Sequence, residues 1–291
     1  MEKLAVLNIG QFERQHVSEF YANTLENHLV TSHRDIEHPH SHDFYLAILF
    51  TKGSGIHEVD FTYYSVQPGS LFLLNPGQTH HWQLSDDISG YVFFHTQGFY
   101  DLEYTHRSLS HYPFFYSMHS SPLINFVGGA MEYITSLFRQ ILSESTSQEP
   151  LCRERLLNLA DLVYIEAARE TIRQAPLPEA NHNHYYLRFR KLESLIEEHF
   201  RQEKSPAAYA GMMHMTPKHL NRITQMVTGK STGKIITDRV LLEAKKELVL
   251  RKKTLNEIAY SLGFSDYAYF SRLFKNHEGE TPSSFLKKYE K

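Results

Sequence analysis

The chain has 291 residues, of which 41% are hydrophobic and 22% charged, and its formal net charge is −3. This composition is typical of a soluble globular protein of about two domains. No run of about 18 apolar residues is present, which excludes a transmembrane helix, and the N-terminus lacks the apolar core of a signal peptide. The single cysteine, Cys152, cannot form an internal disulfide, so we expect a reducing, cytoplasmic location.

Charge is divided unevenly along the chain. Residues 185–291 carry 20 Lys and Arg against 12 Asp and Glu, a net charge of +8, whereas residues 1–184 carry 10 against 21, a net charge of −11. A basic module joined to an acidic one predicts that the C-terminal part binds a polyanion. Solvated surface charge would give the same split, so the motifs have to decide between the two interpretations.

Short strand-like segments follow one another between about residues 42 and 95. The apolar run 44–50 stops at Gly53-Ser54-Gly55, and a segment rich in β-branched and aromatic residues follows at 56–64. Pro68-Gly69 and Pro76-Gly77 provide further turns, beside segments at 70–74, 82–84 and 91–94. Many short strands with Gly and Pro turns predict a small β-barrel or sandwich, which we place at residues 1–124.

Helical periodicity begins after about residue 124. We predict a helical pair at residues 125–173, with helices over 126–142 and 153–173, and an interdomain linker at 174–184. The second helix is apolar on more than one side, with Leu156, Ala160, Val163 and Ala167 at helical spacing. Packing against the barrel and a homodimer contact both explain this surface, and the two can coexist.

A helix-turn-helix pattern occurs twice between residues 205 and 285, at a spacing of 50 residues. Leu220-Asn221-Arg222-Ile223 matches Phe270-Ser271-Arg272-Leu273, and Gly229-Lys230-Ser231 matches Gly279-Glu280-Thr281. In the first motif we expect Ser205-Pro206 and Thr216-Pro217 to begin helices, with Tyr209, Ala210, Met212 and Met213 packing the first of them. In the second we expect Thr254 and Ser265 as helix caps, Gly263 at the sharp turn, and a helix at 237–250 joining the motifs.

Such a doubled motif with basic charge predicts an all-α DNA-binding domain at residues 185–291. Arginine can read guanine, and asparagine or glutamine can read adenine, in the major groove, whereas Lys230, Lys234 and Lys275 suit phosphate. The outward-facing candidates are Lys218, His219, Asn221, Arg222 and Gln225 in the first motif and Tyr267, Ala268, Tyr269, Ser271, Arg272 and Lys275 in the second.

The run from Ile258 to Lys275, followed by Gly279-Glu280-Thr281-Pro282, resembles the signature of AraC/XylS-type bacterial transcription regulators. The resemblance covers about residues 185–291. His214 departs from it, because some relatives have glycine in the first turn, and so does Ala268, where some relatives carry a polar residue. Both departures put the base contacts, rather than the fold, in question.

A second segment is similar to the cupin-like N-terminal domain of the same family. It runs from His38-Pro39-His40-Ser41-His42 through Pro68-Gly69 to Asn75-Pro76-Gly77-Gln78-Thr79-His80, within about residues 25–100. The resemblance implies a double-stranded β-helix barrel that binds a small-molecule effector, followed by a helical pair that mediates dimerisation. The expected effector-binding residues are His40, His42, Phe44, Ile48, His57, Phe72, His80 and Trp82.

Histidines in this pattern have another interpretation. His40, His42 and His80 could bind a divalent metal, as in cupin enzymes, but Leu46 and Ala47 stand where such enzymes usually have a carboxylate, and Glu58 lies on the next strand. We therefore expect no metal, no cofactor and no catalytic residues, and keep a metal-dependent cupin enzyme with an accessory DNA-binding domain as the alternative. A barrel closed by aromatic side chains, acting only in assembly, is a third.

Together these features predict an α+β multidomain protein: a sequence-specific transcription regulator controlled by a small molecule bound in the barrel. The expected partners are double-stranded promoter DNA, an effector such as a sugar or an aromatic compound, a second copy of the chain and, for an activator, RNA polymerase.

Overall fold

The computed structural model describes residues 5–12, 17, 19–31, 39–101, 109, 112–116, 120–174 and 183–289. These residues form two compact units, and the boundary along the chain falls between residues 176 and 177. Positions 175–182 of the predicted linker lie outside the described residues, whereas its first position ends the helix Cys152–Gln174 and its last two belong to a helix that begins at Asn183. Among the described residues, no helix is long and apolar enough to cross a membrane.

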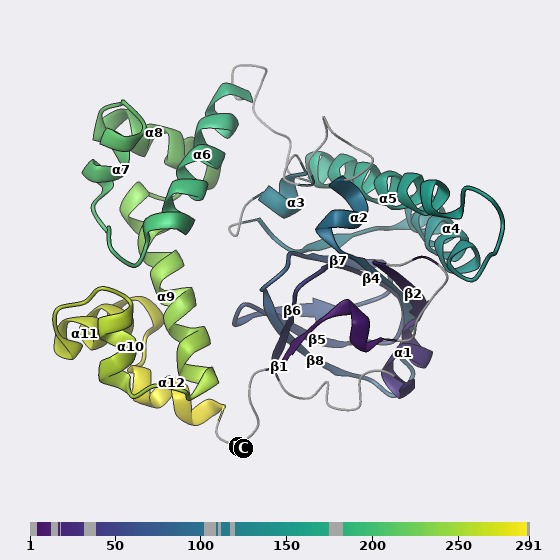
Figure 1. The fold of residues 1–291 in the computed structure, drawn as a ribbon, viewed down its shortest axis with the longest axis horizontal. Helices are drawn as coiled ribbons and strands as arrows, with labels where there is room; N and C mark the ends of the chain where they lie inside the picture. The colour runs from purple at the N-terminus through teal and green to yellow at the C-terminus, as the bar shows by residue number, and fades with distance from the viewer. Residues whose placement is uncertain are drawn as a thin grey trace. The chain divides into compact units, whose positions relative to one another are not determined.

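The N-terminal unit consists of two five-stranded sheets with helices against one of them (Figure 1). One sheet has the strand order β1-β3-β8-β5-β6 and the other β10-β7-β4-β9-β2. The strands are β1 (Ala5–Leu7), β2 (Phe20–Thr24), β3 (His40–His42), β4 (Tyr45–Lys52), β5 (Gly55–Val59), β6 (Thr62–Val66), β7 (Ser70–Leu74), β8 (Thr79–Leu84), β9 (Ser89–His95) and β10 (Leu123–Asn125). The helices are η1 (Ile9–Gln11), α1 (Leu25–Thr31), α2 (Gln97–Asp101), α3 (Pro113–Tyr116), α4 (Gly128–Ser145) and α5 (Cys152–Gln174).

Strand β4 shows how the chain separates an inner from an outer apolar layer. Leu46, Ile48 and Phe50 join the cluster between the sheets, whereas Ala47 and Leu49 join the cluster that α4 and α5 cover. Successive side chains of a strand point to opposite faces, so a continuous apolar run indicates a strand buried on both sides. The inner layer therefore holds the effector-binding candidates, and the helical pair closes the other face of this sheet.

The segment 56–64, predicted as one strand, is instead the end of β5, a turn and the start of β6. The turn residues Asp60 and Phe61 have φ angles of 47° and 65°, the left-handed region that a tight hairpin turn of this kind requires. The Asp60 carboxylate accepts hydrogen bonds from the Thr79 backbone N–H and the Gln78 side chain, which stabilises a turn without glycine.

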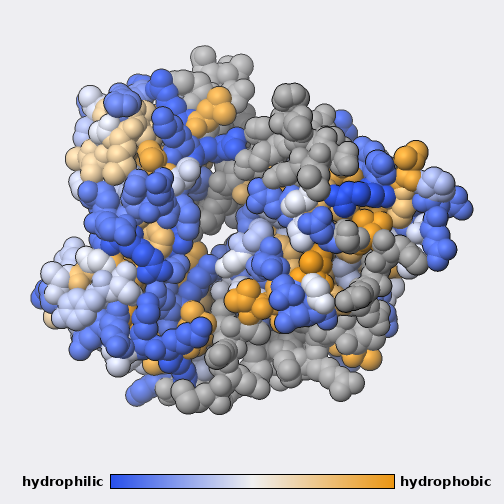
Figure 2. All heavy atoms as spheres, in the orientation of Figure 1, coloured by the Kyte–Doolittle hydropathy of each residue, from blue (hydrophilic) through white to orange (hydrophobic). Residues whose placement is uncertain are grey.

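The C-terminal unit is all-α. Its helices are α6 (Asn183–His199), α7 (Pro206–Met212), α8 (Pro217–Thr228), α9 (Thr232–Leu250), α10 (Leu255–Ser261), α11 (Tyr267–Glu278) and α12 (Pro282–Lys288). The long helix α9 runs between α6–α8 and α10–α12, and begins five residues earlier than predicted because Ser231 caps it (Figure 1). On the face shown in Figure 2, hydrophilic side chains cover most of this unit and apolar ones form small separate areas, as on an ordinary protein surface.

Candidate DNA interface and effector site

The two recognition helices, α8 and α11, start and end in the same way. Thr216 caps α8 by accepting a hydrogen bond from the His219 N–H, and Asp266 caps α11 by accepting one from the Tyr269 N–H. The predicted cap of α11, Ser265, was therefore wrong, because the residue after it caps the helix. Each helix ends at a glycine in the left-handed conformation, Gly229 (φ 70°) and Gly279 (φ 81°), which are the two glycines that the repeat aligns.

The turn before each recognition helix also has left-handed backbone. In the first motif it is His214, at φ 53°, and in the second Gly263, at φ 78°. A Cβ atom on Gly263 would lie 1.9 Å from the backbone oxygen of Arg201, so only glycine fits there. Of the residues predicted to pack α7, Tyr209, Ala210 and Met213 are buried and Met212 is 37% exposed, so that prediction was wrong for Met212.

Partly buried ion pairs and hydrogen bonds connect α6, the turn after it and α10 to α9. Arg201 donates to Glu243 and Glu247 on α9, at 2.6 and 3.0 Å, and to the backbone oxygen of Ser261 in α10. Burial raises the pKa of Glu247, but hydrogen bonds from Lys253, Arg201 and Ser261 outweigh this and keep that pKa below its ordinary value. Because one guanidinium, in the turn after α6, bonds to both α9 and α10, Arg201 stabilises the placement of the second motif against α9.

A second arginine reinforces this arrangement. Arg239 of α9 donates to Glu197 of α6, at 2.6 and 2.8 Å, and to Glu243 at 3.0 Å. Its guanidinium also lies 3.9 Å from the centre of the Phe200 ring, a favourable cation–π contact. These contacts hold α6 against α9.

The residues predicted to contact DNA all lie on α8 or α11. Seven are exposed and four are half-buried, the latter being His219, Asn221, Tyr267 and Ser271. The Asn221 side-chain oxygen accepts a hydrogen bond from the Thr232 N–H at 3.0 Å, so this residue links α8 to α9. That bond occupies the acceptor that a bidentate contact with adenine needs. Asn221 is therefore the weakest of the predicted base contacts.

Two of the three lysines expected to bind phosphate, Lys230 and Lys234, already pair with a carboxylate, whereas Lys275 is exposed on α11. Lys230 and Lys234 lie 2.9 and 3.0 Å from the two oxygens of Asp238. Lys234 also lies 2.9 Å from His277 on α11, and so connects α9 to the second motif. Two cations share one anion here, which leaves a net positive charge beside both motifs.

Sequence reasoning missed a contribution of α6 to the first recognition helix. Arg188 of α6 lies 2.8 Å from the Nε2 atom of His219, and Arg222 lies 3.2 Å from its Nδ1 atom. A neutral imidazole has one acceptor nitrogen, so only one of the two arginines can donate a hydrogen bond to it. The Arg222 guanidinium also lies over the ring of Tyr185 in α6, 5.8 Å from its centre.

In the N-terminal unit, the structure brings all eight effector-binding candidates together. Each is buried, with 5% exposure or less, and the rings of all but Ile48 form one network of contacts in the layer between the sheets. The His57 ring lies 4.4 Å from Phe72 and 5.2 Å from Trp82, and the His42 ring lies 4.6 Å from Phe44. Phe12, Tyr21 and Phe94, which the sequence did not single out, belong to the same layer.

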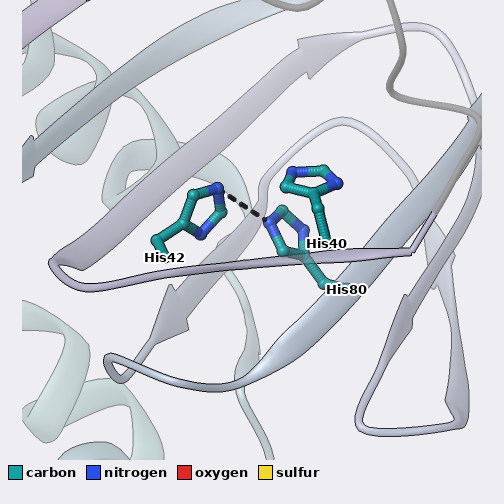
Figure 3. A group of neighbouring side chains, drawn as sticks. All are labelled: His40, His42 and His80. Atoms are coloured by element: carbon teal, nitrogen blue, oxygen red, sulfur yellow. Dashed lines mark hydrogen bonds between the residues drawn. The ribbon is translucent and has the colours of Figure 1, made fainter. Parts of the chain in front are cut away.

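Three of these residues, His40, His42 and His80, form a compact group (Figure 3). His40 and His80 are directly paired across β3 and β8, and the nearest ring nitrogens of His42 and His80 lie 3.4 Å apart. His57 lies behind His80, its Nε2 atom 2.8 Å from the Nδ1 atom of His80. Burial, with smaller contributions from His40 and His81, lowers the pKa of His57 to about 3, so this imidazole is neutral at pH 7.

His28 of α1 makes the stability of the barrel depend on pH. Burial, together with the charge of His40, lowers the pKa of His28 to about 4, against 6.5 for an unperturbed histidine. Below pH 6.5 the unfolded chain binds a proton that the folded barrel does not. The stabilisation is therefore complete above pH 6.5 and is lost as the pH falls towards 4. Between pH 6.5 and 5 we expect His28 to account for a loss of about 2 kcal/mol in the free energy of unfolding.

Unfolding in urea, followed by the emission of the single tryptophan Trp82, measures this effect because Trp82 lies in the barrel. In His28→Gln, which keeps a polar atom near the Tyr21 hydroxyl that His28 contacts at 3.1 Å, the pH dependence becomes shallower than in the wild-type protein. Equal slopes in the two proteins would show that His28 does not carry the effect.

Comparison with known proteins agrees with this two-part architecture. Residues 29–160 match the model of the AraC-like ligand binding domain, and residues 209–288 match that of a helix-turn-helix domain. The chain is 22% identical to the HTH-type transcriptional activator RhaS of Enterobacter sp. (strain 638), over 84% of this chain and 85% of that protein. It is 23% identical to the arabinose operon regulatory protein of Salmonella typhimurium (strain LT2), over 86% of each chain.

Among solved structures, that of wild-type ToxT from Vibrio cholerae with a bound unsaturated fatty acid is 15% identical and has a TM-score of 0.45, over 94% of this chain and 97% of that one. At this level the similarity carries no weight in the assignment, which rests on the two matched domains and on the relatives that share both. The chain is a member of the AraC/XylS family of transcription regulators, with an N-terminal domain that binds a small-molecule effector and a C-terminal helix-turn-helix domain that binds DNA.

Proposed function

We propose that α8 and α11 each enter the major groove and read two segments about 10 base pairs apart on one face of promoter DNA. The observation that carries this proposal is the equivalence of the two helices in caps, length and ends, with one helix, α9, packed against both motifs. Arg222, Gln225 and Arg272 are exposed and have the chemistry to read bases. Lys218, Lys275 and the helix N-termini then contact phosphate.

We also propose that the effector binds between the two sheets of the barrel. Its binding changes how α8 and α11 contact DNA. Support comes from the grouping of four imidazoles with Phe44, Phe72 and Trp82 in one buried layer. Imidazoles orient polar atoms and the aromatic rings cover apolar ones, which suits a sugar or an aromatic acid. The protein acts in the cytoplasm, where promoter DNA lies, and as an activator it also contacts RNA polymerase.

The proposal includes no catalysis, because the relatives sharing both domains are transcription regulators. It does include a homodimer formed through α4 and α5. Most apolar side chains of α5 pack against the barrel, but Leu162 and Ile172 remain 38% and 45% exposed, and Tyr133 of α4 is 48% exposed. Light scattering over a range of protein concentrations tests the dimer, with Leu162→Glu expected to shift the mass towards the monomer.

Ligand screening with Trp82 emission tests the effector site. A ligand at about 100 times its Kd stabilises the folded state by about 2.7 kcal/mol, so it raises the thermal midpoint of the Trp82 transition. We expect compounds that raise this midpoint to change the affinity for DNA as well. A compound that binds in the barrel tightly and leaves DNA affinity unchanged would contradict its role as an effector.

A further inference from the structure

The group of His40, His42 and His80 has the composition and geometry of a metal site. One ring nitrogen from each histidine lies within 4.8 Å of those of the other two, and all three side chains are at least 95% buried. They come from two adjacent strands, β3 and β8, and lie on the inner face of the sheet, pointing towards one another (Figure 3). A site built on paired strands holds its ligands more rigidly than one built on loops.

The separation between two of the ligands already suits a metal ion. The Nε2 atoms of His42 and His80 are 3.4 Å apart. Two nitrogens bound at about 2.0–2.1 Å from a tetrahedral ion lie about 3.3–3.4 Å from each other. His40, directly opposite His80 in the register, needs only to adjust its side chain to provide the third nitrogen.

His57 can hold His80 in the tautomer that a metal requires. Its Nε2 atom lies 2.8 Å from the Nδ1 atom of His80. When the proton is on Nδ1 of His80 and is donated to His57, the Nε2 atom of His80 carries a lone pair that faces His42. A hydrogen bond to the second ring nitrogen is the usual way in which proteins orient a metal-binding histidine.

The nearby carboxylate, Glu58, lies on the opposite face of the sheet. Glu58 is paired in register with His81 and its carboxylate lies 3.4 Å from the His81 ring, whereas His57 and His80 are on the inner face. The ligand set is therefore three imidazoles, which suit Zn²⁺, Fe²⁺, Ni²⁺ or Cu²⁺ rather than Mg²⁺ or Ca²⁺.

We propose that His40, His42 and His80 bind one divalent transition metal ion inside the barrel, with His57 as the residue that positions His80. Three protein ligands leave at least one coordination position for water or for an oxygen or nitrogen donor of another molecule. If the effector binds in this layer, which rests on the proposed function, a carboxylate or hydroxyl group of the effector takes that position. The metal site itself does not depend on that function.

Titration of the full-length, untagged chain with Co²⁺, after removal of metals by a chelator, tests the site. Trp82 is the only tryptophan, and its ring lies 5.3 Å from His80, so Co²⁺ bound at the three histidines quenches its emission. We expect one Co²⁺ per chain, quenching that is complete at that ratio, and recovery of the emission when Zn²⁺ displaces Co²⁺. Absence of stoichiometric quenching in the folded protein would overturn the proposal.

Variants distinguish this site from the other histidines of the chain, which number 19 in total. His80→Phe and His42→Gln should each weaken Co²⁺ binding at least about 100-fold, since each removes one of three ligands. The matched control is His81→Phe, which removes the neighbouring imidazole from the other face and should leave the affinity unchanged. Thermal unfolding of each variant without metal shows whether that variant folds. If His80→Phe or His42→Gln does not fold, His40→Gln is tested in its place. Binding that survives the loss of any one of the three ligands in a folded variant would contradict the assignment.

The role of His57 has its own test. His57→Leu should lower the affinity for Co²⁺ about 10–100-fold without abolishing binding, because the ligands remain but His80 loses its orienting partner. His57→Gln, whose amide oxygen can accept the proton of His80 Nδ1, should restore part of that loss. Equal affinities in the two variants would show that His57 only fills space. A shift of the Co²⁺ visible spectrum on adding azide would show the open position, and its absence would exclude an effector bound to the metal.

Discussion

Gly263→Asn is expected to lower the free energy of unfolding of the C-terminal unit by about 3 kcal/mol. Gly263 has a φ of 78°, and a Cβ atom there would lie 1.9 Å from the backbone oxygen of Arg201. Asparagine tolerates the left-handed backbone better than most residues, so the loss arises mainly from the steric clash. Urea unfolding followed by far-UV circular dichroism measures it, with Trp82 emission as the separate reading from the barrel.

Gly229→Asn is the matched control for this substitution. Gly229 has nearly the same backbone conformation, with a φ of 70°, but no described atom lies within 4 Å of the position of its Cβ. The control should therefore cost about 1 kcal/mol or less. If both variants lost the same stability, the contact between the second turn and Arg201 would not be what holds the second motif in place.

Arg272→Ala is expected to weaken binding to a specific site about 10–100-fold while changing binding to random DNA much less. Arg272 lies exposed on α11, and a bidentate contact between arginine and guanine accounts for about 1–3 kcal/mol of discrimination. Arg272→Lys separates charge from geometry, because it keeps the positive charge and loses the planar fork. We expect it to bind random DNA like the wild-type protein and to lose most of the preference for the specific site.

Fluorescence anisotropy with both DNAs, at several salt concentrations, measures these effects. A phosphate contact would instead weaken both complexes in Arg272→Ala and would be restored by lysine. Lys252→Ala, in the loop between α9 and α10, removes one charge outside the recognition helices and serves as the control. If Arg272→Ala weakened binding to the specific site only as much as Lys252→Ala does, Arg272 would not be a base-reading residue.

What the sequence predicted well was governed by local signals. Thr216 and Thr254 cap their helices as expected, and Gly263 forms the turn, because capping and left-handed backbone depend on a few adjacent residues. The resemblance to a known family supplied the placement of the histidines in the inner layer. Strand periodicity then placed Trp82, two residues after His80, on the same face as His80.

The missed features depend on contacts between distant parts of the chain. The hairpin at Asp60-Phe61 lacks glycine and is stabilised from β8, so no local pattern indicated it. The bond between Asn221 and Thr232 spans the junction of two helices, and the bonds of Arg201 span 42 to 60 residues. Similarly, the contact of His57 with His80 follows from the pairing of β5 with β8, a register that the sequence alone does not determine.

Selection of DNA fragments from a random pool at about physiological salt, followed by sequencing, tests whether both recognition helices read DNA sequence. We expect an enriched site with two elements about one helical turn, or 10 base pairs, apart. We further expect that Arg222→Ala loses sequence preference in one element and Arg272→Ala in the other. Folded protein that enriches no site, with Zn²⁺ or small-molecule cell extract either present or absent, would contradict sequence reading by the two recognition helices.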